Sequence, residues 1–245
     1  MKKIWIIARK DIREAFRSRS TYMFILIMLV ITFSYVSSYN AYVKTLTSQQ
    51  AINDFSHSFL NALAYILPMM YSIFVCSIFA NYSVIVDKAK RNIESLMATP
   101  ISITQLWIGK SLAVTLPSIV VGFCVSALAY PFITIGFVMP NTHTFIFPGT
   151  LAIISAIIIV PILIFSIVTI VINIQLIISN PRIANFVFTG IFMLFVFGVS
   201  ALGGFGISIS YFPLIYLGVI ALCAGVSFIL SRALTKEKVL LSSKM

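Results

Sequence analysis

Residues 149–178 read GTLAIISAIIIVPILIFSIVTIVINIQLII, a run of 30 residues without a charged side chain. A helix of that length rises roughly 45 Å, whereas the hydrocarbon core of a bilayer is roughly 30 Å thick. The run is therefore long enough to cross a membrane, and we expect it to form a transmembrane helix.

Five other segments are similarly long and apolar. The six predicted spans cover residues 21–40, 59–86, 111–139, 149–178, 183–202 and 211–231. None of them contains Asp, Glu, Lys, Arg or His. Gly203, Gly204 and Gly206, followed by Pro213, separate the fifth span from the sixth by a turn. The sequence thus predicts an all-α integral membrane protein whose residues 1–245 form one transmembrane domain with six transmembrane helices.

The composition excludes an ordinary soluble domain. The chain is 60% hydrophobic and only 9% charged, with a mean hydropathy of +1.07, whereas soluble domains carry roughly 25% charged residues. The net charge of +11 does not indicate nucleic-acid binding, because the basic residues lie at the ends of the apolar runs. There they can contact anionic lipid headgroups.

The distribution of Lys and Arg predicts the orientation. Of 17 such residues, all except Lys44 fall on one side of the six-span layout. Cytoplasmic loops carry the excess of positive charge, so we expect both termini in the cytoplasm and the protein in the cell membrane. Adding or removing one span would spread the basic clusters over both sides, which favours six.

Two terminal segments flank the spans. In residues 1–20, Ile4, Ala8, Ile12 and Phe16 recur every four residues and basic side chains occupy another face. This pattern is typical of an amphipathic helix in the membrane interface; a solvated basic leader is the alternative. Residues 232–245 form a basic tail, expected in the cytoplasm.

The segment 87–110 between the second and third spans is predicted to be helix, break, helix. Thr99-Pro100 ends the first helix, because proline cannot continue the hydrogen-bond ladder. Ser102 and Gln105 have the spacing of a capping box, which predicts a second helix running through Gly109 and Lys110 into the third span. The first helix is amphipathic and is interpreted either as docking into a soluble partner or as lying on lipid headgroups.

This segment resembles the cytoplasmic loop of permease subunits of type-2 ATP-binding-cassette exporters. The resemblance rests on Asp87-Lys88, on the run from Ile93-Glu94 to Thr99-Pro100-Ile101-Ser102, and on Gly109-Lys110. It implies a coupling helix that contacts a separate ATPase subunit. The residues expected at that contact are Arg91, Ile93, Glu94, Leu96, Met97 and Pro100.

The resemblance also implies where the chemistry occurs. ATP and Mg²⁺ would be bound by the partner ATPase, while this chain would form a homodimer or a heterodimer with a related permease. Gly109-Lys110-Ser111 imitates the end of a phosphate-binding loop, but Thr104 stands where that loop requires glycine. We therefore expect no cofactor on this chain and no ATP hydrolysis by it.

Polar and aromatic residues in the spans are candidates for a translocation pathway. Asn61 and Tyr65 lie in the second span, and Asn173 and Gln175 in the fourth. Such side chains also join helices to one another by hydrogen bonds in lipid. The resemblance further implies an apolar gate in the fifth span, formed by Phe188, Phe192 and Phe195.

No catalytic or metal site is expected. Cys76, Cys124 and Cys223 lie singly in apolar runs and are predicted to be small buried residues. His57 and His143 have no companion ligands.

Two further classes remain as alternatives: a membrane scaffold or assembly protein, and an integral-membrane lipid enzyme, which the absence of a plausible base in the spans disfavours. Kinks are predicted at Pro68, Pro117, Pro131 and Pro161.

Overall fold

The fold is taken from a computed structural model of the chain. It describes residues 26, 29–30, 32–33, 36–37, 39–80, 84, 87–89, 102–178, 190 and 211–234. Within these residues all regular secondary structure is helical and no strand occurs. The all-α prediction is confirmed for this part of the chain.

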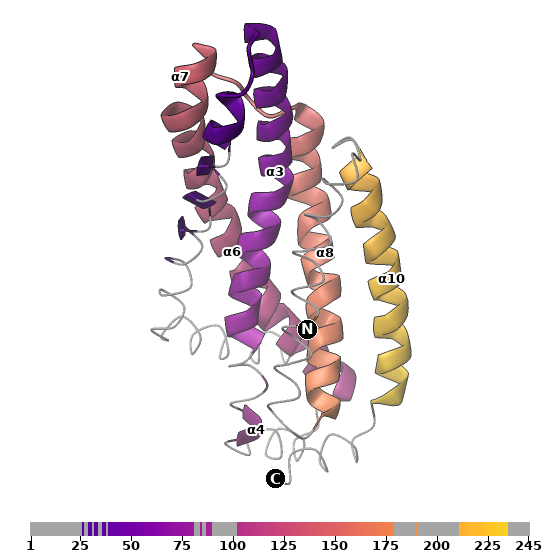
Figure 1. Cartoon of the computed structure of the whole chain (residues 1–245). Helices are drawn as coiled ribbons and strands as arrows, with labels where there is room; N and C mark the ends of the chain where they lie inside the picture. The colour runs from indigo at the N-terminus through magenta and orange to yellow at the C-terminus, as the bar shows by residue number, and fades with distance from the viewer. Residues whose placement is uncertain are drawn as a thin grey trace.

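Four long helices dominate the described structure (Figure 1). They are α3 (Gln49–Ala80), α6 (Ile103–Ile133), α8 (Thr150–Ile177) and α10 (Phe212–Ala233). A π-helix, η2 (Thr134–Val138), and a short α7 (Met139–Thr142) prolong α6 without interruption, and α4 (Asp87–Ala89) is a single turn. Four segments, with α6 counted through to Thr142, are long and apolar enough to cross a membrane. The chain is thus a helical membrane protein.

The two other predicted spans are described only in part. The described residues between 26 and 43 are helical, in agreement with a first span, and of residues 183–202 only Gly190 is described. The N-terminal helix predicted over 1–20 and almost all of the basic tail lie outside the described residues. The count of six and the orientation therefore stay predictions.

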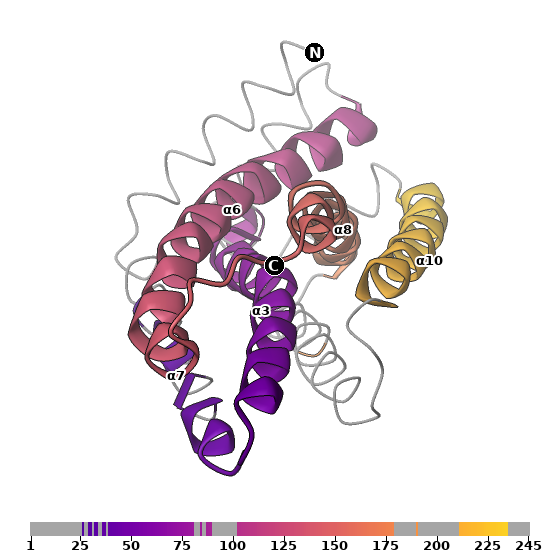
Figure 2. The ribbon, with the colours of Figure 1, turned by 90° about the horizontal axis from the view of Figure 1, so that it is seen from above.

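The helices form a bundle centred on α8. α3, α6 and α8 pack against one another, and α10 packs against α8; Figure 2 shows α8 between them, seen along the bundle. α4 lies at the end of the bundle where α6 begins and α8 ends, which we call the loop end (Figure 1). α7 and the start of α3 lie at the opposite end.

Helix α8 has no charged residue, and its many apolar side chains are divided between the core and the surroundings of the bundle. Val160, Leu163, Ile164 and Ile167 are buried at three- and four-residue spacing. Large aliphatic residues cover the other side and are exposed, among them Leu151, Ile154, Ile157, Ile158 and Ile162. A helix with apolar residues all round fits an environment of lipid, so the exposed side chains are the ones available to the bilayer.

The four prolines of the predicted kinks all lie inside helices. Pro131 lies three residues before the start of the π-helix, where the N–H of Thr134 donates to the carbonyls of both Pro131 and Tyr130. Because proline lacks an N–H and disturbs the regular ladder, a local change of helix type at this point has a physical cause. The helix ends where His143 adopts a left-handed conformation with φ of 55°.

Two helices begin earlier than the predicted spans. α3 begins at Gln49 instead of residue 59, because the hydroxyl of Ser48 accepts a hydrogen bond from the N–H of Ala51 at 3.3 Å. Phe55 and Phe59 on its first turns pack against Tyr39, with ring centroids 5.7 and 4.7 Å away. α6 begins at Ile103, ahead of residue 111, as the capping residues predict.

Candidate functional site

The start of α6 is fixed by a capping box. The N–H of Gln105 donates to the hydroxyl of Ser102 at 3.2 Å, and the N–H of Ser102 donates to Oε1 of Gln105 at 3.3 Å. Two N–H groups without partners inside the helix are thus satisfied. The predicted helix from Ser102 through Gly109 and Lys110 into the third span is confirmed.

A buried ion pair joins the two ends of segment 87–110. Lys110 Nζ donates to Asp87 Oδ2 at 2.7 Å, and the side chains are 0% and 2% exposed. Removing two charges from water is costly, so such a pair persists only with good geometry. The distance corresponds to a charge-assisted hydrogen bond. The pair therefore fixes α4 against α6.

The next residue, Lys88, contacts a different helix. Its Nζ donates to the carbonyl oxygens of Leu176 at 3.1 Å and Ile178 at 2.8 Å, at the end of α8. The last carbonyls of a helix have no partner within it, and a cation is favourable near this negative end of the helix dipole. Asp87 and Lys88 together attach α4 to both α6 and α8.

The amine of Lys88 is expected to titrate unusually low. Burial disfavours its charged form and lowers its pKa from 10.5 to about 8. Its reaction with a small amine-modifying reagent should therefore reach half of its maximal rate near pH 8, whereas an ordinary lysine does so above pH 10. Mass spectrometry of the modified peptide, measured from pH 6 to pH 11, checks the midpoint. A midpoint above pH 10 would contradict the burial of this amine.

The structure changes the interpretation of Lys110 and leaves the predicted partner contact undescribed. Lys110 belongs to the basic residues counted in the loops, but it lies inside α6 and is buried. A counter-charge on α4 makes this burial possible. The residues predicted to contact an ATPase lie outside the described residues: Arg91, Ile93, Glu94, Leu96, Met97 and Pro100.

Two of the described pathway candidates, Asn61 and Tyr65, join elements of the bundle. Asn61 Oδ1 accepts the N–H of Gly149, the residue that caps α8, at 2.6 Å. The ring of Tyr65 is buried and lies 6.0 Å from that of Phe212 on α10. These contacts fit the helix-joining alternative, and the pathway assignment stays a prediction. The predicted gate residues Phe188, Phe192 and Phe195 lie outside the described part of the chain.

Buried amides occur near the loop end of α8. Asn173 Nδ2 donates to Ser227 Oγ on α10 at 3.3 Å, a hydrogen bond between two helices. Gln175 is 1% exposed, and neither its oxygen nor its nitrogen has a partner. An unpaired buried amide is costly, which makes Gln175 the least satisfied side chain of this turn.

The cysteines do not form a site, and one of them differs from its prediction. Cys76 and Cys223 are buried, but Cys124 is exposed. Val120 and Leu128, one turn before and after Cys124, are exposed as well, so this face of α6 points away from the bundle. Within the described residues, no group of three His, Cys, Asp or Glu side chains is placed to hold a metal ion.

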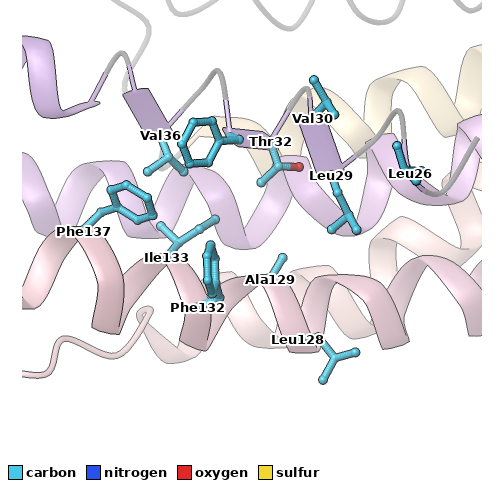
Figure 3. Close-up of a pocket in the computed structure, with 11 residues that line it drawn as sticks. Leu26, Leu29, Val30, Thr32, Val36, Leu128, Ala129, Phe132, Ile133 and Phe137 are labelled. Carbon is cyan, nitrogen blue, oxygen red and sulfur yellow. The ribbon is translucent and has the colours of Figure 1, made fainter.

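An apolar cleft of about 590 Å³ lies between the described residues of the first predicted span and α6 (Figure 3). Its lining is aliphatic and aromatic apart from Thr32, whose hydroxyl is hydrogen-bonded to that of Tyr71. Phe132 and Ile133 approach it from α6, and Phe137 approaches it from η2 (Figure 3). With such a lining the cleft offers apolar contact and no charged group among the described residues.

Comparisons with known proteins do not supply a function: no family model matches this chain, and no curated protein matches it. We therefore infer the function from the geometry. In the described part of the chain, the concentrated charge lies at the loop end, where α4 is bonded to α6 and α8. Such an arrangement suits the transmission of force between helices.

Proposed function

We propose that this chain is the transmembrane permease subunit of an ATP-driven exporter of the type-2 ATP-binding-cassette class. It forms the translocation pathway, as a homodimer or with a related permease, in the cell membrane with both termini in the cytoplasm. Segment 87–110 docks on a separate ATPase subunit, which binds ATP and Mg²⁺. Closure of the ATPase moves this segment and changes the arrangement of the spans.

The observation that carries this proposal is the buried pair of Asp87 and Lys110. Both residues belong to the motif that resembles the exporter loop, and they stand at the two ends of the segment. A loop that only rests on headgroups needs no buried charge at its base, because exposed basic residues suffice for that contact. A loop that transmits movement needs a firm attachment to the helices it moves. Packed helices switch between discrete arrangements when one of them is displaced, because their interfaces do not deform continuously.

The test is association with an ATPase. We expect the chain to copurify with an ATP-binding-cassette ATPase encoded near it and to stimulate ATP hydrolysis. The double variant Glu94→Ala/Leu96→Ala should weaken association about tenfold or more, because residues central to an interface carry most of the binding energy. Binding by titration and the rate of ATP hydrolysis measure both effects.

The matched control is Lys44→Ala, an exposed residue at the opposite end of the bundle, which should leave binding and hydrolysis unchanged. Unaltered association of the Glu94 and Leu96 double variant would contradict the docking role. Labelling of a Ser95→Cys variant from outside intact cells would do the same, since it would place the segment on the wrong side of the membrane. Copurification without stimulated hydrolysis would favour the scaffold alternative.

A further inference from the structure

The end of α8 is held by a residue that is distant in the sequence. Ile177 is the last residue of α8 and Ile178 is extended, with its N–H bonded to the carbonyl of Ile174 at 2.9 Å. The Lys88 amine donates hydrogen bonds to the carbonyls of Leu176 and Ile178, on either side of this end. Because Lys88 belongs to α4, movement of α4 acts directly on the last turn of α8.

That last turn is poorly satisfied in the described arrangement. Gln175 lies within it, with both amide atoms buried and without partners, and Asn173 Oδ1 also lacks one. A packed interior offers no water to replace a missing hydrogen bond, so each such group raises the free energy of this arrangement. These unpaired groups therefore favour a shift of the turn once its end is released.

Helix α6, which packs against α8, also carries buried polar groups without partners. The hydroxyls of Ser111 and Thr115, one turn apart and directly after Lys110, are buried and without partners as well. Hydroxyls and amides both donate and accept hydrogen bonds. Both helices therefore hold buried polar groups that the described arrangement leaves unpaired. A second arrangement in which such groups gain partners would make this end of the bundle a two-state element.

We propose that Lys88 is a positioning residue that holds the last turn of α8 in one of two arrangements. Displacement of segment 87–110 withdraws the Lys88 amine from the α8 carbonyls, and the turn then shifts until Gln175 gains partners. This inference rests on the proposed function, because the ATPase supplies the displacement. Since Asn173 bonds Ser227 and α10 packs on α8, the shift is passed on to α10.

Hydrogen exchange of the backbone amides of residues 174–178 tests, in the purified chain, whether Lys88 holds the last turn of α8. The variant Lys88→Met should accelerate this exchange about tenfold or more, since a charged hydrogen bond to the helix end is lost. Lys88→Arg should restore slow exchange, because it keeps a cation and N–H donors. Gln175→Leu should slow exchange below the wild-type rate by removing the unpaired amide. The first turn of α6, capped by Ser102, should exchange alike in all variants.

The same measurement in the complex with the ATPase tests whether nucleotide binding to the ATPase releases the last turn of α8. Locking the wild-type complex with a non-hydrolysable ATP analogue should accelerate exchange at 174–178. In Lys88→Met, exchange should be fast with and without the analogue. In Gln175→Leu, which lies outside the docking segment, the response should be diminished while ATPase binding stays normal. A merely structural role for Lys88 would leave the nucleotide response intact.

The possible failures are distinguishable. If wild-type chain binds the ATPase but exchange at 174–178 ignores the nucleotide, or if Lys88→Met exchanges like wild type, this inference is wrong and the proposed function stands. If no ATPase binds the wild-type chain, the proposed function fails and this inference fails with it. Should Lys88→Met not fold, Gln175→Leu and Lys88→Arg still decide between these outcomes.

Discussion

Replacing either member of the buried ion pair is expected to lower the free energy of unfolding by about 3–5 kcal/mol. Asp87→Asn leaves the Lys110 ammonium buried without the carboxylate 2.7 Å away, and Lys110→Met leaves the Asp87 carboxylate in the corresponding position. The large effect arises because the charge that remains stays buried after its partner in the pair is lost. The attraction within the pair is a smaller part of it.

The double variant separates these two contributions. Asp87→Asn/Lys110→Met removes both charges and should regain most of the stability that either single variant loses, because neither charge then has to be buried. The exchanged variant Asp87→Lys/Lys110→Asp should also retain more stability than the singles if the two side chains face each other as described. Single variants that lose less than about 1 kcal/mol would indicate an exposed pair and contradict the geometry.

The buried cysteines provide the measurement. In a Cys124→Ser background, the remaining thiols of Cys76 and Cys223 are buried and react with a fluorescent maleimide as the bundle opens. A titration with denaturing detergent in mixed micelles then gives the free energy of unfolding of each variant. Lys44→Met, a change at an exposed lysine, is the matched control and should stay within about 0.5 kcal/mol of the parent.

The helices were predictable where their apolar runs end abruptly. Residues 149–178 predict α8 to within one residue at each end, because Pro148 and Ser179-Asn180 flank a long run without charged residues. The start of α6 was predictable for another reason: Ser102 and Gln105 cap the helix through side chains that the sequence displays. The early start of α3 was not, because Asn53, Asp54 and His57 make its first turns too polar for a span defined by hydropathy.

The candidate site was predictable only as a segment. Hydropathy places Lys110 in a loop, since it cannot reveal that a carboxylate 23 residues earlier lies beside it. Two of the groups that Lys88 contacts are backbone carbonyls at the end of α8, which no residue type discloses. The apolar run around Cys124 predicts burial, but it does not tell which face of α6 the bundle covers.

Gly122→Ala is expected to destabilise the bundle although it adds one methyl group. A Cβ at this position would lie 2.1 Å from Ser72 Oγ, 2.7 Å from the Ser72 backbone nitrogen and 2.9 Å from its Cα. α3 and α6 thus meet with their backbones almost in contact, as small residues allow in membrane helices. Because backbone atoms cannot rotate away, the helices must separate, at a cost of about 1–3 kcal/mol or more.

The contribution of the backbone contact can be isolated by combining substitutions. Ser72→Ala alone should cost little, since the Ser72 hydroxyl has no partner in the described structure. Ser72→Gly/Gly122→Ala removes the shortest contact but leaves the new Cβ close to the Ser72 nitrogen and Cα, so it should recover only part of the loss. Full recovery would show that the side chain, and not the backbone, limits the approach of the two helices.

Gly225→Ala is the control for the effect of adding a methyl group to a helix glycine. A Cβ at Gly225 on α10 would meet nothing within 4 Å, so this variant should remain within about 0.5 kcal/mol of the parent. Both variants are compared by the maleimide titration in the Cys124→Ser background. Equal stability of Gly122→Ala and Gly225→Ala would mean that α3 and α6 do not cross at Ser72 and Gly122. The loop-end bonds of α4 would then join helices packed differently from those described.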